Sequence, residues 1–217
     1  MYNRITRRIV SNIDTMIKPS KLVHHRYNQY IGWSFLSNIL SSAESALSTH
    51  SMLQAVNTPD SDIMRTFNYI GKDIIGQLGG LFFMARIGKQ ADERPKRFLL
   101  YSNIFQQLAF TSVCLSPYFP SYFLPIAGLS NIMFNLSFTG FGAINAKCIY
   151  VLSNKSNNTG EIYAKITVIN TFGSSIGLLL GLGINILCPT PESRLIFIPV
   201  LAIGRVYCFQ KAVKHIL

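Results

Sequence analysis

Two long stretches of this chain carry no charged side chain. No Asp, Glu, Lys or Arg occurs from Phe98 to Ala146, which is 49 consecutive residues, and none occurs from Ile166 to Pro191. About 25–35% of a soluble surface is charged, so neither stretch can form one. The chain is 49% hydrophobic, which also excludes intrinsic disorder. The sequence therefore predicts an all-α protein, a polytopic bundle of membrane-spanning helices.

Six segments are candidates for spanning helices, which need about 20 mostly apolar residues. They are Ile31–Val56, Ile63–Ile87, Phe98–Tyr118, Tyr122–Ile144, Ile162–Leu187 and the shorter Leu195–Phe209. Proline-containing turn sequences lie between several of them. We therefore expect a single transmembrane domain over residues 31–217, preceded by a basic juxtamembrane segment over residues 1–30.

The basic residues alternate from one predicted connection to the next. Seventeen Lys and Arg residues fall before the first span, in the second and fourth connections and near the C-terminus, whereas the other side carries only Arg194. Positively charged loops stay on the cytoplasmic side of a membrane. This predicts an even number of spans with both termini on the cytoplasmic-like side. We expect a cysteine at Asp60 to be labelled from outside, and one at Lys89 or Asn157 not. The net charge of +11 is thereby assigned to loops, and no nucleic-acid partner is expected.

The N-terminal segment places isoleucines four residues apart beside arginines. One interpretation is a helix that contacts anionic lipid headgroups, with the bilayer as its partner. The other is an organelle presequence, against which Asp14 counts. The organelle stays open between plastid, mitochondrial and endomembrane compartments.

Ionisable residues recur near the expected bilayer midplane. At about 1.5 Å per residue, Glu44 of the first span lies at the same depth as Lys72 and Asp73 of the second. A charge at that depth costs at least roughly 2.5–3.5 kcal/mol, so we expect Lys72 to pair with Glu44. Asp73, about 100° further around its helix, should then face the amides of the third span, which are Asn103, Gln106 and Gln107. These six residues form the candidate polar midplane site, and the alternative is a network that only orders the bundle.

Small residues at a spacing of four mark helix faces that can approach closely. They are Gly76 and Gly80 in the second span and Gly173, Gly177 and Gly181 in the fifth. No nucleophile–base pair and no metal-ligand spacing is present. We therefore expect no catalytic site, no metal site and no enzymatic activity, and the sequence assigns no cofactor.

Several short motifs in a fixed order resemble the Root UVB sensitive family, a membrane domain of vitamin B6 photoprotection and homeostasis. The resemblance runs from about Pro19 to the end. It is carried by Lys72-Asp73 followed by Gly76, by the turn Ser116–Pro120, and by Lys211-Ala212-Val213. Further motif positions in the connections are Lys96, Arg97, Asn158, Glu161 and Lys165.

The resemblance implies a membrane protein linked to the UV-B response and vitamin B6 homeostasis, with plastid members in plants. Asn145 stands where members have an arginine, and Asn103, Gln106 and Gln107 stand where members have acidic residues. Members usually continue into a soluble C-terminal domain, which we do not expect here. Two hypotheses follow: a non-enzymatic, carrier-like protein with a polar midplane site, or a scaffold that acts through protein partners. A homodimer or a complex with a family paralogue is the expected assembly.

Overall fold

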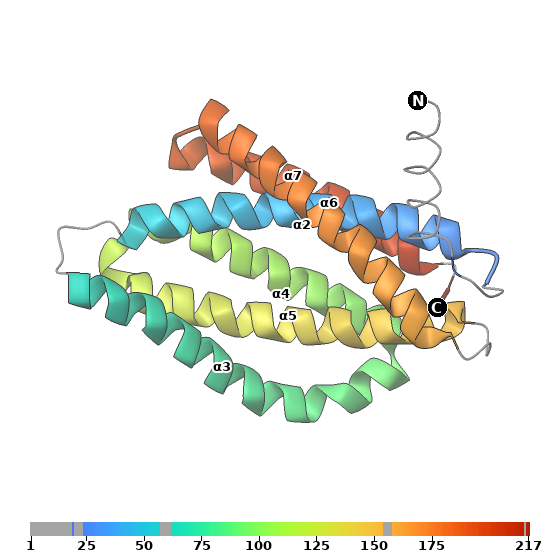
Figure 1. Ribbon diagram of the computed structural model, residues 1–217. Helices are drawn as coiled ribbons and strands as arrows, with labels where there is room; N and C mark the ends of the chain where they lie inside the picture. The colour runs from blue at the N-terminus through green and yellow to red at the C-terminus, as the bar shows by residue number, and fades with distance from the viewer. Residues whose placement is uncertain (1–18, 20–23, 57–61, 154–157, 215) are drawn as a thin grey trace.

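The computed structural model describes residues 19, 24–56, 62–153, 158–214 and 216–217. Within these ranges the chain forms six α-helices and two short 3-10 helices, and no strand (Figure 1). The α-helices are α2 (Tyr27–Val56), α3 (Asp62–Glu93), α4 (Pro95–Leu115), α5 (Phe123–Leu152), α6 (Thr159–Leu187) and α7 (Pro191–Lys214). The all-α prediction is confirmed, and each α-helix contains all or most of one of the six predicted segments. Most of the basic segment 1–30 lies outside the described residues.

Proline sets several of the helix boundaries. Pro95 occupies the first turn of α4, where its missing N–H costs nothing. Pro117 and Pro120 lie in the two 3-10 helices, η1 (Ser116–Tyr118) and η2 (Pro120–Tyr122), which join α4 to α5. The expected turn there is thus two tight helical turns.

The last helix is longer than the sequence predicted. It begins at Pro191 rather than Leu195 and continues to Lys214, so that Arg194 and Arg205 both belong to it. Among the described residues, three helical segments are long and apolar enough to cross a membrane: Pro95–Tyr118, Thr159–Leu187 and Pro191–Lys214. The predicted short sixth span is therefore a long apolar helix.

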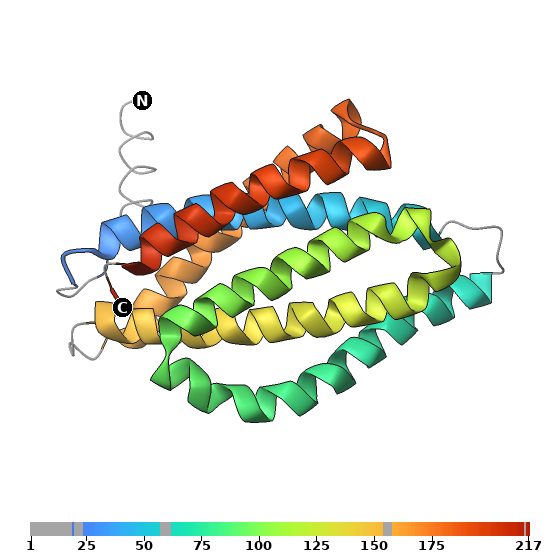
Figure 2. The same cartoon turned by 180° about the vertical axis from the view of Figure 1, so that it is seen from behind.

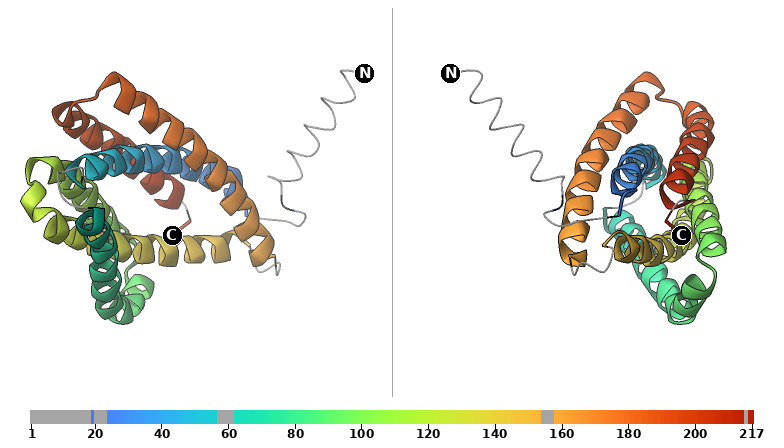
Figure 3. Two further views of the ribbon diagram at one scale, coloured as in Figure 1. Left: turned by 60° about the vertical axis from the view of Figure 1, so that its left-hand side comes forward. Right: turned by 90° about the vertical axis from the view of Figure 1, so that its right-hand side faces the viewer.

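The helices form two layers of three (Figures 1 and 2). In one layer α2 packs against both α6 and α7, and in the other α5 packs against both α3 and α4. Helix α4 also contacts α2 and α7 and so links the layers. The end-on view of Figure 3 shows α2 between α6 and α7. Helices α2 and α3 are consecutive in sequence but belong to different layers.

The two ends of the bundle are sealed by apolar clusters. One cluster joins the start of α2 to the end of α7 and includes Tyr27, Leu152, Ile162 and Val213. The described ends of the chain thus lie at the same end of the bundle. Smaller clusters around Leu47 and Phe123 close the opposite end, and polar side chains fill the region between.

The glycine stripes lie at the closest helix contacts. A Cβ atom built on Gly177 would overlap the carbonyl oxygen of Ile39, and one built on Gly181 would lie 2.8 Å from the carbonyl oxygen of Ala43. Gly173 is likewise buried against Phe35 of α2. Larger residues would therefore force α6 away from α2. On α3, Gly76 and Gly80 are both buried, and Gly76 faces Asn131 of α5.

Candidate functional site

A polar cavity of about 500 Å³ lies between the two layers. Its walls come from five helices, α2 to α6. Most of the lining side chains are polar: Asn38, Ser41, Ser42, Ser45, Ser48, Thr49, Lys72, Asp73, Gln77, Gln106, Asn131, Asn135 and Ser174. Serine recurs along α2 because its small side chain leaves room on the face that looks across the bundle. The cavity therefore offers many hydrogen-bonding groups in an otherwise apolar molecule.

Lys72 and Asp73 form an ion pair in the wall of this cavity. The Lys72 Nζ atom donates to Asp73 Oδ1 at 2.7 Å, and Asn131 Nδ2 of α5 donates to the same oxygen at 2.7 Å. The Lys72 ammonium also lies 4.3 Å from the centre of the Tyr69 ring, a cation–π arrangement. The side chain of Lys72 is 8% exposed and that of Asp73 is 48% exposed. The carboxylate is thus the accessible partner.

The expected pairing of Lys72 with Glu44 is wrong. The 100° between adjacent Cα–Cβ directions separates Lys72 and Asp73 only at the base of their side chains. The four methylene groups of lysine nevertheless let its ammonium bend back to the neighbouring carboxylate. The expected contact of Asp73 with Asn103, Gln106 and Gln107 is also wrong, because α3 packs on α5 and Asp73 meets Asn131 there. Gln106 does line the same cavity.

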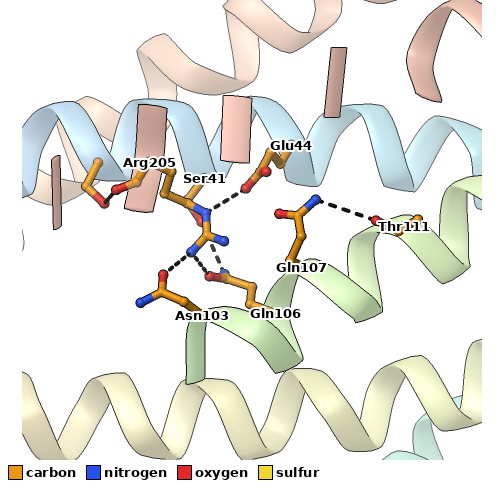
Figure 4. A network of polar contacts seen from close by, with 8 residues as sticks. Ser41, Glu44, Asn103, Gln106, Gln107, Thr111 and Arg205 are labelled. Carbon is orange, nitrogen blue, oxygen red and sulfur yellow. Dashed lines mark hydrogen bonds and ion pairs between the residues drawn. The ribbon is translucent and has the colours of Figure 1, made fainter. Parts of the chain in front are cut away.

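Glu44 pairs instead with Arg205 of the last helix (Figure 4). The Arg205 Nε and Glu44 Oε2 atoms are 2.8 Å apart, and the side chains are 3% and 0% exposed. The two atoms are close enough for an ion pair, but their orientation does not form a hydrogen bond. Neither atom has a hydrogen-bond partner among the described residues. This pair joins α2 to α7 in the interior.

Two amides of α4 complete the shell around Arg205. Its Nη1 group donates to Asn103 Oδ1 at 3.1 Å and to Gln106 Oε1. Gln106 Nε2 in turn donates to Ser41 Oγ at 3.3 Å. Gln107 points along its own helix and contacts Thr111 (Figure 4). Asn103 and Gln106 therefore accept hydrogen bonds from Arg205, whereas Gln107 contacts neither ion pair.

A second cavity of about 320 Å³ adjoins the first. The two share Asn38, Ser41, Gln106 and Phe138. The second is lined by Arg205, whose Nη2 atom has no hydrogen-bond partner among the described residues. The polar interior thus runs from the Lys72–Asp73 pair to the arginine.

The count of basic residues assigns Arg205 to the C-terminal tail. The signal that identifies it was present, since Arg205 falls within the predicted span Leu195–Phe209. An ionisable residue inside a span requires a partner, and Glu44 carries the opposite charge in another span.

Arg194 was assigned to a loop and is instead fully buried. Its guanidinium donates to Ser51 Oγ at 3.1 Å, to Gln54 Oε1 at 2.8 Å and to the Pro189 carbonyl oxygen at 2.5 Å. These contacts tie the start of α7 to the end of α2.

The remaining motif residues lie outside the two cavities. Lys96 and Arg97 occupy the first turn of α4. Asn158 immediately precedes α6, and its carbonyl oxygen accepts the N–H of Ile162 at 3.0 Å. Glu161 and Lys165 form an ion pair of 3.3 Å one turn apart on α6. These residues lie near the starts of α4 and α6, at the end of the bundle where α2 begins.

The described residues bring together no group of three His, Cys, Asp or Glu side chains that could hold a metal ion. What they offer instead is an accessible ion pair among amides and hydroxyl groups. Such a set can bind a small polar molecule through hydrogen bonds and complementary charge.

A family model described as "Vitamin B6 photo-protection and homoeostasis domain" matches residues 3–217. The chain is 29% identical over 170 residues to protein root UVB sensitive 4 of Arabidopsis thaliana, a stretch covering 77% of this chain and 32% of that relative. It is 28% identical over 196 residues to the protein named root UVB sensitive 2, chloroplastic, of the same plant, covering 89% of this chain and 45% of the relative.

The family resemblance seen in the motifs is confirmed by these matches. The chain spans less than half the length of both relatives. No solved structure matches it.

Proposed function

Since the chain belongs to the family of the vitamin B6 photo-protection and homoeostasis domain, we propose that it is a multi-pass membrane protein that binds a small polar ligand between its two layers. The description of the family names vitamin B6 homoeostasis, and the names of the relatives refer to UV-B sensitivity. The observation that carries the proposal is the cavity of about 500 Å³ with Lys72 and Asp73 in its wall.

The membrane setting rests on the reversed polarity of the bundle. Large apolar side chains cover the outside, including Phe82 at 81%, Leu187 at 82% and Leu179 at 69% exposure. Charged groups such as Glu44 and Arg205 lie inside. In a membrane, lipid contacts the apolar outer surface, and charged groups in the interior are stabilised by pairing with one another. In this setting all six described helices cross the bilayer, with both termini on the cytoplasmic-like side.

The ligand class follows from the accessible groups. Asp73 presents a half-exposed carboxylate and Lys72 a cation, surrounded by amides and hydroxyl groups. A small molecule that carries both polar and charged groups fits this set, and B6 vitamers are of this kind and agree with the family. Binding sites near the midplane are typical of carriers. The proposed role is non-enzymatic and carrier-like.

Ligand-dependent thermal stability tests this role. The purified full chain in detergent is heated with pyridoxine, pyridoxal or pyridoxal phosphate, and with glucose and glutamate as unrelated solutes. We expect one vitamer to raise the melting temperature of the wild type and of Glu161→Gln, and to leave Asp73→Asn unshifted. A shift that persists in Asp73→Asn would place the ligand elsewhere. The lack of a shift with every vitamer would remove the proposed substrate class.

The rival function is a membrane scaffold without a transported ligand. Helix α3 favours it, because an apolar groove runs along its exposed face and is lined by Ile63, Phe67, Ile70 and Ile74. A homodimer or a family paralogue would dock there. A scaffold tolerates Asp73→Asn in a complementation assay, whereas a carrier loses activity at normal protein levels.

The membrane topology has its own test. Cysteine labelling with an impermeant maleimide should modify a residue introduced at Asp60 from outside, but not one introduced at Lys89 or Asn157. Outside labelling at Asn157 would contradict the arrangement. A tagged chain then distinguishes plastid, mitochondrial and endomembrane locations, of which the plastid agrees with the name of one relative.

A further inference from the structure

A second, chemically different groove lies between the first turns of α4 and the last turns of α7. Its volume is about 440 Å³. The lining residues are Lys96, Leu99, Leu100, Tyr207, Gln210, Lys211, Val213 and Lys214. It shares no residue with the two central cavities, so the proposed ligand site does not account for it.

The charge of this groove is uncompensated within the part of the chain that the structure describes. Three lysines line it, one from α4 and two from α7, and no Asp or Glu lines it. No described carboxylate forms an ion pair with Lys96, Lys211 or Lys214. Three cations gathered around one groove repel one another, and an anion between them would relieve that repulsion.

The rest of the lining is apolar. Leu99 and Val213 are buried beneath the lysines, and Leu100 and Tyr207 form exposed walls. The Lys211 Nζ atom lies 5.5 Å from the centre of the Tyr207 ring, and Trp33 packs edge-on against that ring at 5.9 Å. Tyrosine and tryptophan beside lysines are typical of the level of lipid headgroups. A soluble anion would contact only the lysines, whereas an amphiphile would contact both the lysines and the apolar walls.

We propose that this groove is a binding site for an anionic phospholipid, with the headgroup phosphate held by Lys96 and Lys211 and the acyl chains lying along Leu100 and Tyr207. Basic pockets between helices on the cytoplasmic side bind such headgroups. The site rests on the proposed membrane location but not on the ligand of the central cavity. It couples the last helix, which carries Arg205, to the composition of the surrounding lipid.

The single tryptophan of the chain supplies the readout, because Trp33 contacts the groove residue Tyr207. The full chain in detergent is titrated with dioctanoyl phosphatidylglycerol, dioctanoyl phosphatidylcholine or glycerol 3-phosphate while Trp33 fluorescence is followed. We expect phosphatidylglycerol to bind at least about 25-fold more tightly than phosphatidylcholine and also more tightly than glycerol 3-phosphate. Each lysine is worth about a fivefold change, so Lys96→Gln/Lys211→Gln should weaken phosphatidylglycerol about 25-fold without changing phosphatidylcholine.

The matched control is Lys147→Gln/Lys165→Gln, which removes the same charge from the same end of the bundle. It should stay within twofold of the wild type, and Lys96→Arg/Lys211→Arg should restore binding. If both double glutamine variants weakened phosphatidylglycerol binding equally, the effect would be a general attraction of the lipid to positive charge, and the proposed site would be overturned. Binding of glycerol 3-phosphate as tight as that of phosphatidylglycerol would make the ligand a free phosphate and overturn the lipid assignment.

Two further outcomes complete the test. The double variant must first be shown to fold, by gel filtration and circular dichroism. If it does not fold, the single variant Lys214→Gln is used instead, and it should weaken phosphatidylglycerol binding about fivefold. Failure of both lipids to bind, together with release of the chain from membranes by carbonate, would overturn the membrane location itself. Failure of phosphatidylglycerol selectivity in a carbonate-resistant protein would overturn only the groove.

Discussion

The interior holds two ion pairs that differ in almost every physical respect. Glu44 and Arg205 come from different helices, are 0% and 3% exposed, and are surrounded by amides of a third helix. Lys72 and Asp73 are neighbours on one helix, and the carboxylate is 48% exposed. We call the first the sealed pair, because neither of its side chains is more than 3% exposed, and the second the open pair, because its carboxylate is accessible from the larger cavity.

This contrast separates a pair that organises the bundle from one available to a ligand. Removing Arg205 leaves Glu44, which is 0% exposed and lines neither cavity, without its cation. Removing Lys72 leaves Asp73 in contact with the cavity and with Asn131. The sealed pair should therefore dominate stability, and the open pair should dominate binding.

The largest expected effect is that of Arg205→Met. Breaking a buried ion pair typically costs about 3–5 kcal/mol, because the remaining charge is left unpaired. We expect a loss of free energy of unfolding of this size in denaturant titrations of the detergent-solubilised chain. The double variant Glu44→Gln/Arg205→Met should recover part of it. A double variant that loses the sum of the two single losses would contradict a direct pairing.

The second prediction tests how closely α6 packs on α2, the helix that contributes Glu44 to the sealed pair. Gly177→Ala should lower the free energy of unfolding by about 1–3 kcal/mol, as overpacking does, because the new Cβ meets the Ile39 backbone. The control is Gly183→Ala on the same helix, where nothing lies within 4 Å, and it should cause no loss. Equal effects in the same titration would mean that the contact of α6 with α2 is loose.

The third prediction concerns the open pair. Asp73→Asn should change the free energy of unfolding by less than about 1 kcal/mol, since the carboxylate is half-exposed and the new amide oxygen still accepts from Asn131. The same variant should lose the ligand-dependent thermal shift. A loss of stability comparable to that of Arg205→Met would erase the contrast between the two pairs.

The smallest expected effect supplies a surface reference for both pairs. Glu161 and Lys165 form an ion pair on α6 with side chains 29% and 15% exposed. Lys165→Gln should lower the free energy of unfolding by about 0.2–0.5 kcal/mol, the usual value one helical turn apart, and less at high salt. A salt-independent loss above 1 kcal/mol would show that this pair is not a surface interaction.

The helices were predictable from the sequence, but their neighbours were not. Apolar runs and proline turns located all six described helices, because they depend on residues close together in the chain. Depth along a helix likewise placed Glu44 and Lys72 in the interior. Depth does not tell which helices touch, and the prediction assumed that consecutive helices pack together. The fold instead separates α2 from α3 into different layers, so Glu44 meets Arg205.

The glycine spacing shows the same limit. It identified the face of α6 that approaches another helix closely, but nothing in the spacing names α2 as that helix. The lysine groove was missed because its members are far apart in sequence. Lys96 and Lys211 were each assigned to a connection or a tail, and only the packing of α4 on α7 brings them together.

The Glu44–Arg205 pair also sets the order in which this protein can be completed. It joins the first and the last of the described helices, so during synthesis α2 leaves the ribosome long before its partner exists. In the proposed bilayer setting, the nascent chain carries a lone carboxylate through the insertion of four intervening helices. Because an unpaired carboxylate at that depth is costly, we expect α2 to stay in a polar environment, or Glu44 to stay protonated, until α7 is inserted. A chain that stops before Arg205 keeps that carboxylate unmatched, which gives quality control a direct mark of an unfinished molecule.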